Sequence, residues 1–283
     1  MNMPFKANLD SKVAVITGGG GVLCGGFARA LSASGAKVAV LDIDLGAAES
    51  VAEELSSTGL AIAVKADVLD RESLAAAHEQ VKKRLGPCDI LLNGAGGNNP
   101  RATTNDEEFD PAALSDPEKK SFFDLDPAGV NFVFGLNFTG PFLTTQEFAR
   151  DMVGRPGGGV IVNVSSMNAY RPLTKIPAYS AAKAAVSNFT QWLAVYFAKE
   201  GIRANAMAPG FFSTKQNSAL LWNSDGTPTA RTEKILRATP MGRFGEVEDL
   251  YGTLLWLCDN KCSGFVTGIT VPIDGGFSAY SGV

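Results

Sequence analysis

The sequence predicts an α/β protein built on a doubly wound, mostly parallel β-sheet with helices on both faces. Short β-branched runs alternate along the chain with stretches whose apolar residues recur at helical spacing. The strand runs are almost wholly apolar, which is typical of parallel strands that helices cover on both sides. The 283 residues contain no internal repeat and no low-complexity linker, so we expect a single domain over residues 1–283.

The first third of the chain shows the alternation most regularly. Strands are expected at 12–17, 37–42, 61–66 and 89–92. Helices are expected between them at 22–34, 46–58 and 72–85. Gly35 follows the first helix and Gly86-Pro87 follows the third, as is usual at helix ends. In such an arrangement ligands bind at the carboxyl ends of the strands.

Two stretches interrupt this order. Residues 97–126 form a long polar insertion where a short connection is usual. This insertion is either a solvated surface loop or a lid that faces the substrate, since it leaves directly from the carboxyl end of a strand. Residues 211–240 are expected to form an irregular loop region on the substrate side.

Elsewhere the alternation resumes. Helices are expected at 130–152, 178–199 and 247–258, and strands at 160–165, 203–208 and 267–273. A glycine turn at 157–159 precedes the fifth strand.

A glycine-rich loop joins the first strand to its helix. Its sequence is TGGGGVLCGG, at 17–26. A loop without Cβ atoms lets backbone N–H groups and a helix N-terminus approach a pyrophosphate, although glycine turns also arise for structural reasons alone. The candidate cofactor-binding residues here are Gly18, Gly20, Gly21, Val22 and Leu23.

Asp42 ends the second strand, 24 residues after Gly18. A carboxylate at this place accepts hydrogen bonds from the adenosine ribose and repels a 2′-phosphate. There is no Arg or Lys between Ala39 and Val64 to bind such a phosphate, so the sequence favours NAD over NADP. Asp44 is an alternative candidate for this role. Asp42 is alternatively only the cap of a turn or of a helix.

Tyr179 and Lys183 stand four residues apart and therefore share one face of a helix. A nearby ammonium group favours the phenolate, which would bring the tyrosine pKa closer to the operating pH of an acid–base catalyst. Alone, this spacing also fits an ordinary surface pair. Ser166, at the end of a strand 13 residues earlier, and Asn137 make a catalytic group the better interpretation.

Together these motifs resemble the short-chain dehydrogenases/reductases of the Ser-Tyr-Lys branch, over almost the whole chain. The resemblance implies a Rossmann fold in which Tyr179 is the general acid/base. Lys183 would lower the tyrosine pKa and bind the nicotinamide ribose, Ser166 would orient the substrate oxygen, and Asn137 would hold a water in a proton relay. The other matching residues are Asp67-Val68, Asn93-Gly94-Ala95-Gly96, Pro209-Gly210 and Asp274-Gly275-Gly276.

The resemblance also implies where the cofactor lies. Asp67 and Val68 would line the adenine, and Asn93, Ala95 and Gly96 would pass beside the riboses. Further cofactor contacts would come from Pro209, Gly210 and Thr214. The glycine loop departs from the family pattern TGxxxGxG, because Val22 and Cys24 occupy its second and third glycine positions. Which amides contact phosphate is therefore left open.

Several segments, among them GGNNPRATT and the C-terminal DGGFSAYSGV, are similar to D-mannonate oxidoreductases (fructuronate reductases). That similarity implies NAD-linked interconversion of D-mannonate and D-fructuronate. A sugar acid needs hydrogen-bonding groups and a cation for its carboxylate. The candidates are Asn98, Arg101, Asn168 and Lys175. The alternatives are a reductase of another polyol, keto-sugar acid or acyl substrate, and a nucleotide-sensing protein without catalysis.

The composition of the chain limits which binding partners and which cellular location we expect. The net charge of −4 argues against a nucleic acid, and the longest uncharged window, 127–146, is too polar to span a membrane. The single histidine, His78, is expected to be an exposed or half-buried helix residue, and no metal site is expected. Four cysteines outside any CxxC motif and an N-terminus unlike a signal peptide predict reduced thiols and a cytoplasmic location.

Aromatic residues suggest self-association. Six phenylalanines are expected in the core or at a subunit interface: Phe122, Phe123, Phe132, Phe134, Phe138 and Phe142. Trp192, Val195 and Tyr196 lie on the helix of Tyr179, which commonly pairs between subunits in the resembled family. A homodimer or homotetramer is therefore expected.

Overall fold

A computed structural model describes residues 7–57, 59–214 and 218–282. Seven parallel strands form one sheet in the order β3-β2-β1-β4-β5-β6-β7. The strands are β1 (Val13–Thr17), β2 (Lys37–Asp42), β3 (Ala61–Lys65), β4 (Ile90–Asn93), β5 (Val160–Val164), β6 (Arg203–Pro209) and β7 (Thr270–Ile273). The direction of winding reverses between β1 and β4, which is where ligands bind in such sheets.

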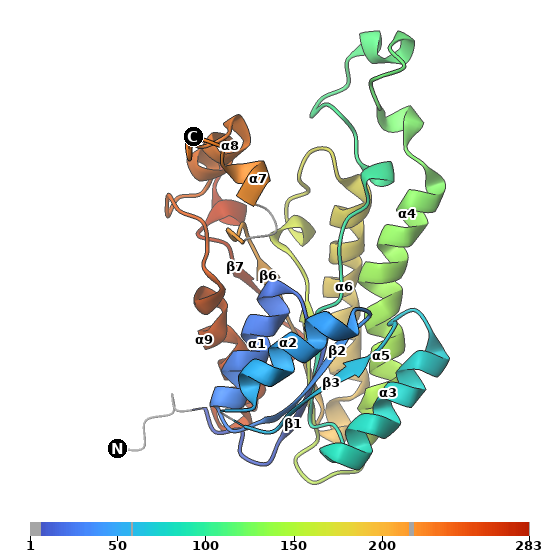
Figure 1. Cartoon of the computed structure of the whole chain (residues 1–283), viewed down its shortest axis with the longest axis vertical. Helices are drawn as coiled ribbons and strands as arrows, with labels where there is room; N and C mark the ends of the chain where they lie inside the picture. The colour runs from blue at the N-terminus through green and yellow to red at the C-terminus, as the bar shows by residue number, and fades with distance from the viewer. Residues whose placement is uncertain (1–6, 58, 215–217, 283) are drawn as a thin grey trace.

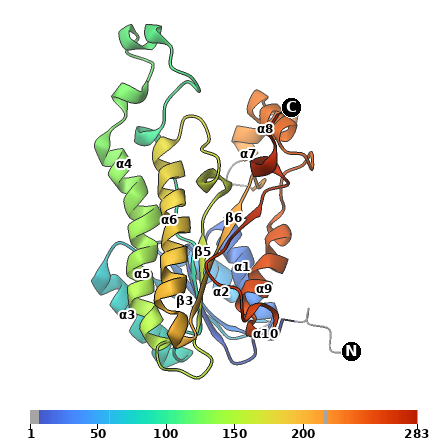
Figure 2. The same ribbon diagram turned by 180° about the vertical axis from the view of Figure 1, so that it is seen from behind.

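Helices cover both faces of the sheet, so the predicted doubly wound α/β fold is confirmed (Figure 2). On one face lie α1 (Val22–Ala33), α2 (Leu45–Leu55) and α9 (Tyr251–Cys258). On the other lie α3 (Arg71–Arg84), α5 (Gly140–Phe148) and α6 (Pro177–Tyr196). Neighbouring residues of β1 serve the two faces in turn: Ile16 packs into the first core and Val15 into the second. Burying each such side chain contributes about 1.5–3 kcal/mol.

The starts of the helices near the glycine loop differ. Asp44 caps α2 by accepting from the Ala47 N–H, and Asp70 caps α3 by accepting from Glu72 and Ser73. The N-cap residue of α1 is Gly21, which provides no side-chain cap, and the first turn of α1 contains no acidic residue. Its N–H groups are therefore without the side-chain acceptor that satisfies the other two helices.

The expected helix at 130–152 is longer at its start and is interrupted. It begins as α4 (Pro127–Phe134), capped by Asp126, passes through a π-turn at Gly135–Thr139 and continues as α5. The final strand starts at Thr270 rather than 267. Thr58, the expected last residue of the second helix, lies outside the described residues.

The expectation that 211–240 is irregular throughout is wrong. This region contains α7 (Ser218–Leu221) and α8 (Ala230–Ala238), the latter capped by Thr229. α8 has nine residues, fewer than the 11–18-residue window over which helical periodicity is recognised. A short helix α10 (Asn260–Ser263) follows α9.

The insertion at 97–126 forms only 3₁₀ turns, at Pro100–Ala102, Pro111–Ser115 and Phe122–Asp124. Figures 1 and 2 show it as an arm that extends past the start of α4, away from the sheet. Phe122 and Phe123 on this arm are 68% and 69% exposed and Phe132 on α4 is 44% exposed, so a core position for these three is wrong.

His78 is not exposed or half-buried, as expected, but buried. Its ring nitrogens lie 2.9 Å from Glu147 Oε1 and 2.8 Å from Asp151 Oδ2. The partners come from α5 and the turn after it, and they satisfy both nitrogens of a ring that packs against Phe148.

The four cysteines are free thiols, three of them buried, as predicted. No helix in the described ranges is long and apolar enough to cross a membrane. Residues 1–6, within the segment on which the signal-peptide expectation rests, lie outside the described residues.

Candidate active site

A cavity of about 400 Å³ opens at the carboxyl ends of β1, β2, β3 and β4. Nine of the predicted cofactor residues line it: Gly18, Gly21, Val22, Leu23, Asp42, Asp67, Val68, Ala95 and Gly96. Its wall also includes residues that sequence reasoning did not name as cofactor contacts, namely Cys24, Ile43, Ala66, Gly94 and Leu136. Ile43 is 64% exposed beside Asp42, and its apolar surface suits the face of a purine ring.

The glycine loop packs too closely on its neighbours to accept side chains. Gly18 adopts a φ of +65°, and a Cβ there would lie 2.8 Å from the Ala95 Cα. The close packing of this loop on the 94–96 segment therefore requires glycine. Together with the uncapped N-terminus of α1, the glycine loop fits a pyrophosphate group.

Asp42 serves both as a turn cap and as part of the cavity wall. Its Oδ2 accepts from the Gly20 N–H at 3.0 Å and its Oδ1 accepts from the Asp44 N–H at 3.0 Å. Each carboxylate oxygen keeps a second lone pair, so the side chain can still accept from ribose hydroxyls. Asp44, its rival, is the cap of α2.

Lys183 on α6 is buried, with 4% of its surface exposed. Its Nζ donates to the Val164 carbonyl at 2.7 Å, and no carboxylate of the described chain pairs with it. Burial lowers its pKa to about 8, which nearby Cys24 counteracts in part. The ammonium lies 5.7 Å from the centre of the Tyr179 ring. A Cβ on Gly96 would lie 3.2 Å from this Nζ, so glycine keeps the approach to it open.

Tyr179 is hydrogen-bonded to Ser166, which joins the end of β5 to α6. Burial raises the pKa of Tyr179 above its ordinary value, and the bond to Ser166 lowers it only in part. The expected lowering by Lys183 is not seen: the pKa of Tyr179 is set by burial and by the bond to Ser166. The phenol keeps its proton at neutral pH and can donate it to an oxygen placed between Ser166 and Tyr179.

Asn137 lies in the π-turn and is fully buried. Its Nδ2 donates to the carbonyls of Gly97, at 2.7 Å, and Val133, at 2.8 Å, while its Oδ1 accepts from the Gly97 N–H at 3.2 Å. Asn137 therefore holds the 96–97 segment in place beside Lys183 through two hydrogen bonds to Gly97. Both amide hydrogens are used, so a relay water would have to bond to an oxygen of Asn137.

The remaining predicted cofactor residues do not line the cavity. They are Gly20, Asn93, Tyr179, Lys183, Pro209, Gly210 and Thr214. The Asn93 side chain is buried and donates to Thr145 at 3.0 Å and to Asn163 at 2.8 Å, which makes it a support of the sheet. Gly210 lies against Asp274, where a Cβ would be 2.6 Å from the aspartate Cα.

A second cavity, of about 790 Å³, has Ile176, the residue that precedes α6, in its wall. Of the predicted substrate residues, Asn98 and Lys175 line it. Arg101 does not, because it is 57% exposed and paired with Asp126 at 3.2 Å. Sequence reasoning missed three charged residues of this wall: Glu107, Arg231 and Lys234.

Asn168 is buried close to Ser166, whose Oγ accepts from its N–H at 3.2 Å. Its Oδ1 has no hydrogen-bond partner among the described residues. A buried acceptor without a partner is costly, and a ligand hydroxyl near Ser166 would satisfy it.

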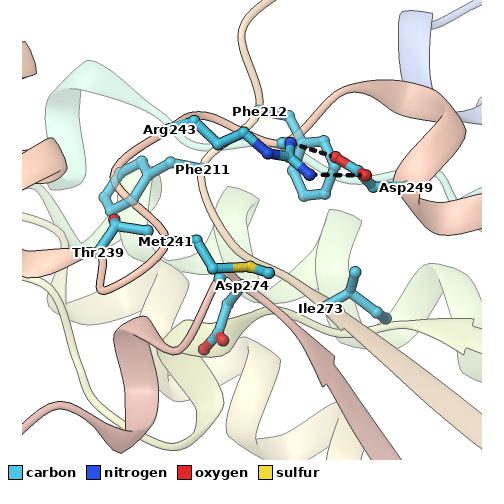
Figure 3. Close-up of a pocket in the computed structure, with 10 residues that line it drawn as sticks. Phe211, Phe212, Thr239, Met241, Arg243, Asp249, Ile273 and Asp274 are labelled. Carbon is cyan, nitrogen blue, oxygen red and sulfur yellow. Dashed lines mark hydrogen bonds and ion pairs between the residues drawn. The ribbon is translucent and has the colours of Figure 1, made fainter.

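A third cavity, of about 210 Å³, lies where β6 and β7 end (Figure 3). The Arg243 guanidinium meets Asp249 over it, with Nη1 2.6 Å from Oδ2. Asp274 accepts from the N–H groups of Gly276 and Ser278, at 2.9 and 2.8 Å. The Asp274-Gly275-Gly276 motif is therefore a structural turn in this chain.

Known proteins are similar to this chain over most of its length. The profile of the short chain dehydrogenase family matches residues 12–223. The chain is 55% identical over 284 residues to a Haemophilus influenzae protein named "Uncharacterized oxidoreductase", covering 100% of this chain and 99% of that protein. It is 54% identical to the "Uncharacterized oxidoreductase UxuB" of Bacillus subtilis, covering 99% and 100%.

A solved structure is similar throughout. It is a crystal structure, with NAD bound, of a Haemophilus influenzae protein that is proposed to be a D-mannonate oxidoreductase. The TM-score is 0.93 at 54% identity, and each chain is covered completely.

Proposed function

Because this chain belongs to the short-chain dehydrogenase family, we propose that it interconverts the secondary alcohol and the ketone of a sugar acid with NAD(H). D-Mannonate and D-fructuronate are the proposed pair. The observation that carries the proposal is the grouping of Ser166, Tyr179 and Lys183: Tyr179 is hydrogen-bonded to Ser166, and Lys183 Nζ lies 5.7 Å from the centre of its ring. The glycine loop and Asp42 line the first cavity, as a dinucleotide requires, and the wall of the second combines apolar side chains with the cations Lys175, Arg231 and Lys234.

NAD(H), when bound, supplies the hydride chemistry at its nicotinamide. The side chains of the protein carry out the proton transfer. Tyr179 gives its hydroxyl proton to the ketone oxygen during reduction and takes the alcohol proton during oxidation, while Ser166 holds that oxygen by a hydrogen bond. Lys183 supplies positive charge beside the phenol and an N–H donor for a ribose hydroxyl.

The choice of NAD over NADP rests on Asp42. Its carboxylate lines the cavity, and no cation stands between residues 39 and 64 to receive a 2′-phosphate. The NAD-bound Haemophilus influenzae protein, at 54% identity, supports the same choice.

We also propose that the enzyme is a homodimer or homotetramer. Trp192, Val195 and Tyr196 on α6 are 54%, 81% and 64% exposed, and the Trp192 and Tyr196 rings stack at 4.6 Å. An apolar surface of this kind is typical of subunit interfaces. The free thiols fit a reducing compartment, so we propose the cytoplasm as its location.

Oxidation of NADH and NADPH tests the substrate directly. D-Fructuronate, D-tagaturonate, 5-keto-D-gluconate and a β-ketoacyl thioester are compared in parallel. We expect the highest kcat/KM with D-fructuronate and NADH. Activity confined to the thioester would contradict the sugar-acid proposal, and NADH binding without turnover of any carbonyl would favour a nucleotide-sensing protein.

A further inference from the structure

Three segments supply most of the wall of the second cavity, and two of them adjoin the proposed catalytic residues in the chain or by a hydrogen bond. Asn98 follows Gly97, which Asn137 holds in place. Residues 173–176 lead directly into α6, which carries Tyr179. The third segment is α8 with the loop before it. A volume of about 790 Å³ lies within the usual size range of small-molecule sites.

This cavity is positive although the chain carries a net charge of −4. Its charged wall residues are Lys175, Arg231 and Lys234 against the single carboxylate Glu107. Lys234 lies 3.0 and 3.1 Å from the two Glu107 oxygens. The pKa of Glu107 is lowered, first by this hydrogen bond and the charge of Lys234, and further by Lys175 and Arg231. All three cations therefore act on one region of the cavity.

Two of these cations are available to a ligand. Within the described part of the chain, the side chains of Lys175 and Arg231 make no hydrogen bond or ion pair. Arg231 presents a planar fork of N–H donors that matches a carboxylate in two parallel hydrogen bonds, whereas Lys175 offers a point charge.

Other basic residues near the site are committed elsewhere. The Arg101 guanidinium pairs with Asp126, and Arg171 donates to the Tyr280 carbonyl at 2.7 Å. Neither lines the cavity.

We propose that Arg231 binds the carboxylate of the sugar acid, with Lys175 beside it, and that Glu107 is the internal carboxylate that competes for the same cations. This assignment rests on the proposed function and identifies the residue that selects acids over neutral polyols. Removing Arg231 weakens binding of acids, whereas removing the charge of Glu107 strengthens it.

Binding to the enzyme–NADH complex, followed by titration calorimetry, tests the assignment without turnover. D-Mannonate is the charged probe and D-mannitol is its neutral counterpart. We expect Arg231→Leu to weaken D-mannonate binding roughly tenfold to a hundredfold, the range for hydrogen bonds to a charged group. Glu107→Gln is expected to tighten it about threefold. Neither variant should change the affinity for NADH or for D-mannitol.

The chain offers matched controls. Arg237→Leu alters another exposed arginine of α8, and Glu108→Gln alters the neighbour of Glu107; neither residue lines the cavity. Both controls should bind D-mannonate like the unmodified enzyme. Arg231→Lys, which keeps the charge but loses the fork, should bind with intermediate affinity, and it replaces Arg231→Leu if that variant fails to bind NADH.

The outcomes separate the two proposals. An unmodified enzyme that neither binds D-mannonate nor reduces any sugar acid contradicts the proposed function. An active enzyme whose Arg231 variants bind D-mannonate as well as the Arg237 control contradicts the role of Arg231 alone. The same loss of affinity for D-mannitol would also overturn it, since the effect would then be on cavity shape.

Discussion

Two buried nitrogen groups on the same side of the sheet have opposite surroundings. His78, on α3, has a carboxylate oxygen within 3 Å of each ring nitrogen. Lys183, on α6, has one main-chain carbonyl and no carboxylate. Burying a cationic group without a counter-charge costs free energy, and the pKa of Lys183 falls to about 8 as a result. We therefore expect His78 to support the fold, whereas the proposed function gives Lys183 a partner in the cofactor ribose.

The largest expected effect is on proton transfer beside Lys183. Tyr179→Phe removes the hydroxyl that exchanges the proton while keeping the ring in its pocket. Because a positioned acid–base group contributes about 10²–10⁴-fold, kcat for D-fructuronate reduction should fall about a thousandfold. The Kd for NADH, measured by fluorescence titration, should change less than twofold. Near-normal turnover by this variant would show that Tyr179 is not the proton donor.

Replacing His78 should affect stability and leave catalysis intact. His78→Leu leaves the buried carboxylate of Asp151, whose side chain is 6% exposed, without its ring partner. Breaking a buried polar pair in this way should lower the free energy of unfolding by roughly 3 kcal/mol. Urea unfolding monitored by circular dichroism measures the loss, and kcat should remain within twofold at a temperature where the variant is folded. A catalytic defect without a loss of stability would contradict the structural role of His78.

Lys183 should also produce a pH dependence of stability. Its folded pKa of about 8 lies below the ordinary value of 10.5, so the unfolded chain binds more protons between these pH values. Stability due to this group therefore rises as pH increases from about 8 to 10.5. Compared with Lys183→Met, the unmodified protein should gain about 3 kcal/mol over this window, at about 1.36 kcal/mol for each pH unit. The thiol of Cys24, whose pKa burial raises to about 12, acts in the opposite direction above pH 9 but is present in both proteins.

The smallest expected effect concerns backbone strain at the substrate cavity. Lys175 has a φ of +72°, a region that favours glycine, and Ser11 has a φ of +67° away from both cavities. Lys175→Gly should stabilise the protein by up to about 1 kcal/mol and raise KM for the sugar acid. Ser11→Gly, as its match, should stabilise the protein similarly and leave KM unchanged. Equal KM values for the two variants would remove Lys175 from the substrate site.

The fold was largely predictable because its signals are local. Apolar runs such as those of β1 and β2 and glycines such as Gly18 act through neighbours in the chain. The positions of Tyr179 and Lys183 on one helix follow from their spacing. What could not be predicted depends on partners distant in the chain. Glu147 and Asp151 reach His78 from about 70 residues away, and Glu107 meets Lys234 across 127 residues.

The residues of the proposed substrate site also depend on contacts that the sequence does not reveal. Arg101 and Lys175 were equally good candidates by composition, and only the ion pair with Asp126 separates them. Arg231 lies on a helix of only nine residues, which is too short for its periodicity to be recognised in the sequence. The burial that raises the pKa of Tyr179 is likewise a property of packing, not of the four-residue spacing.

The unfolding free energy and the turnover of Lys183→Met at pH 7 test the central contrast most directly. If Lys183 is a buried charge kept for function, the variant should be more stable than the unmodified protein, by up to about 3 kcal/mol, while kcat with NADH and D-fructuronate falls at least a hundredfold. A variant that loses stability, as expected for His78→Leu, or that retains full turnover would contradict this account.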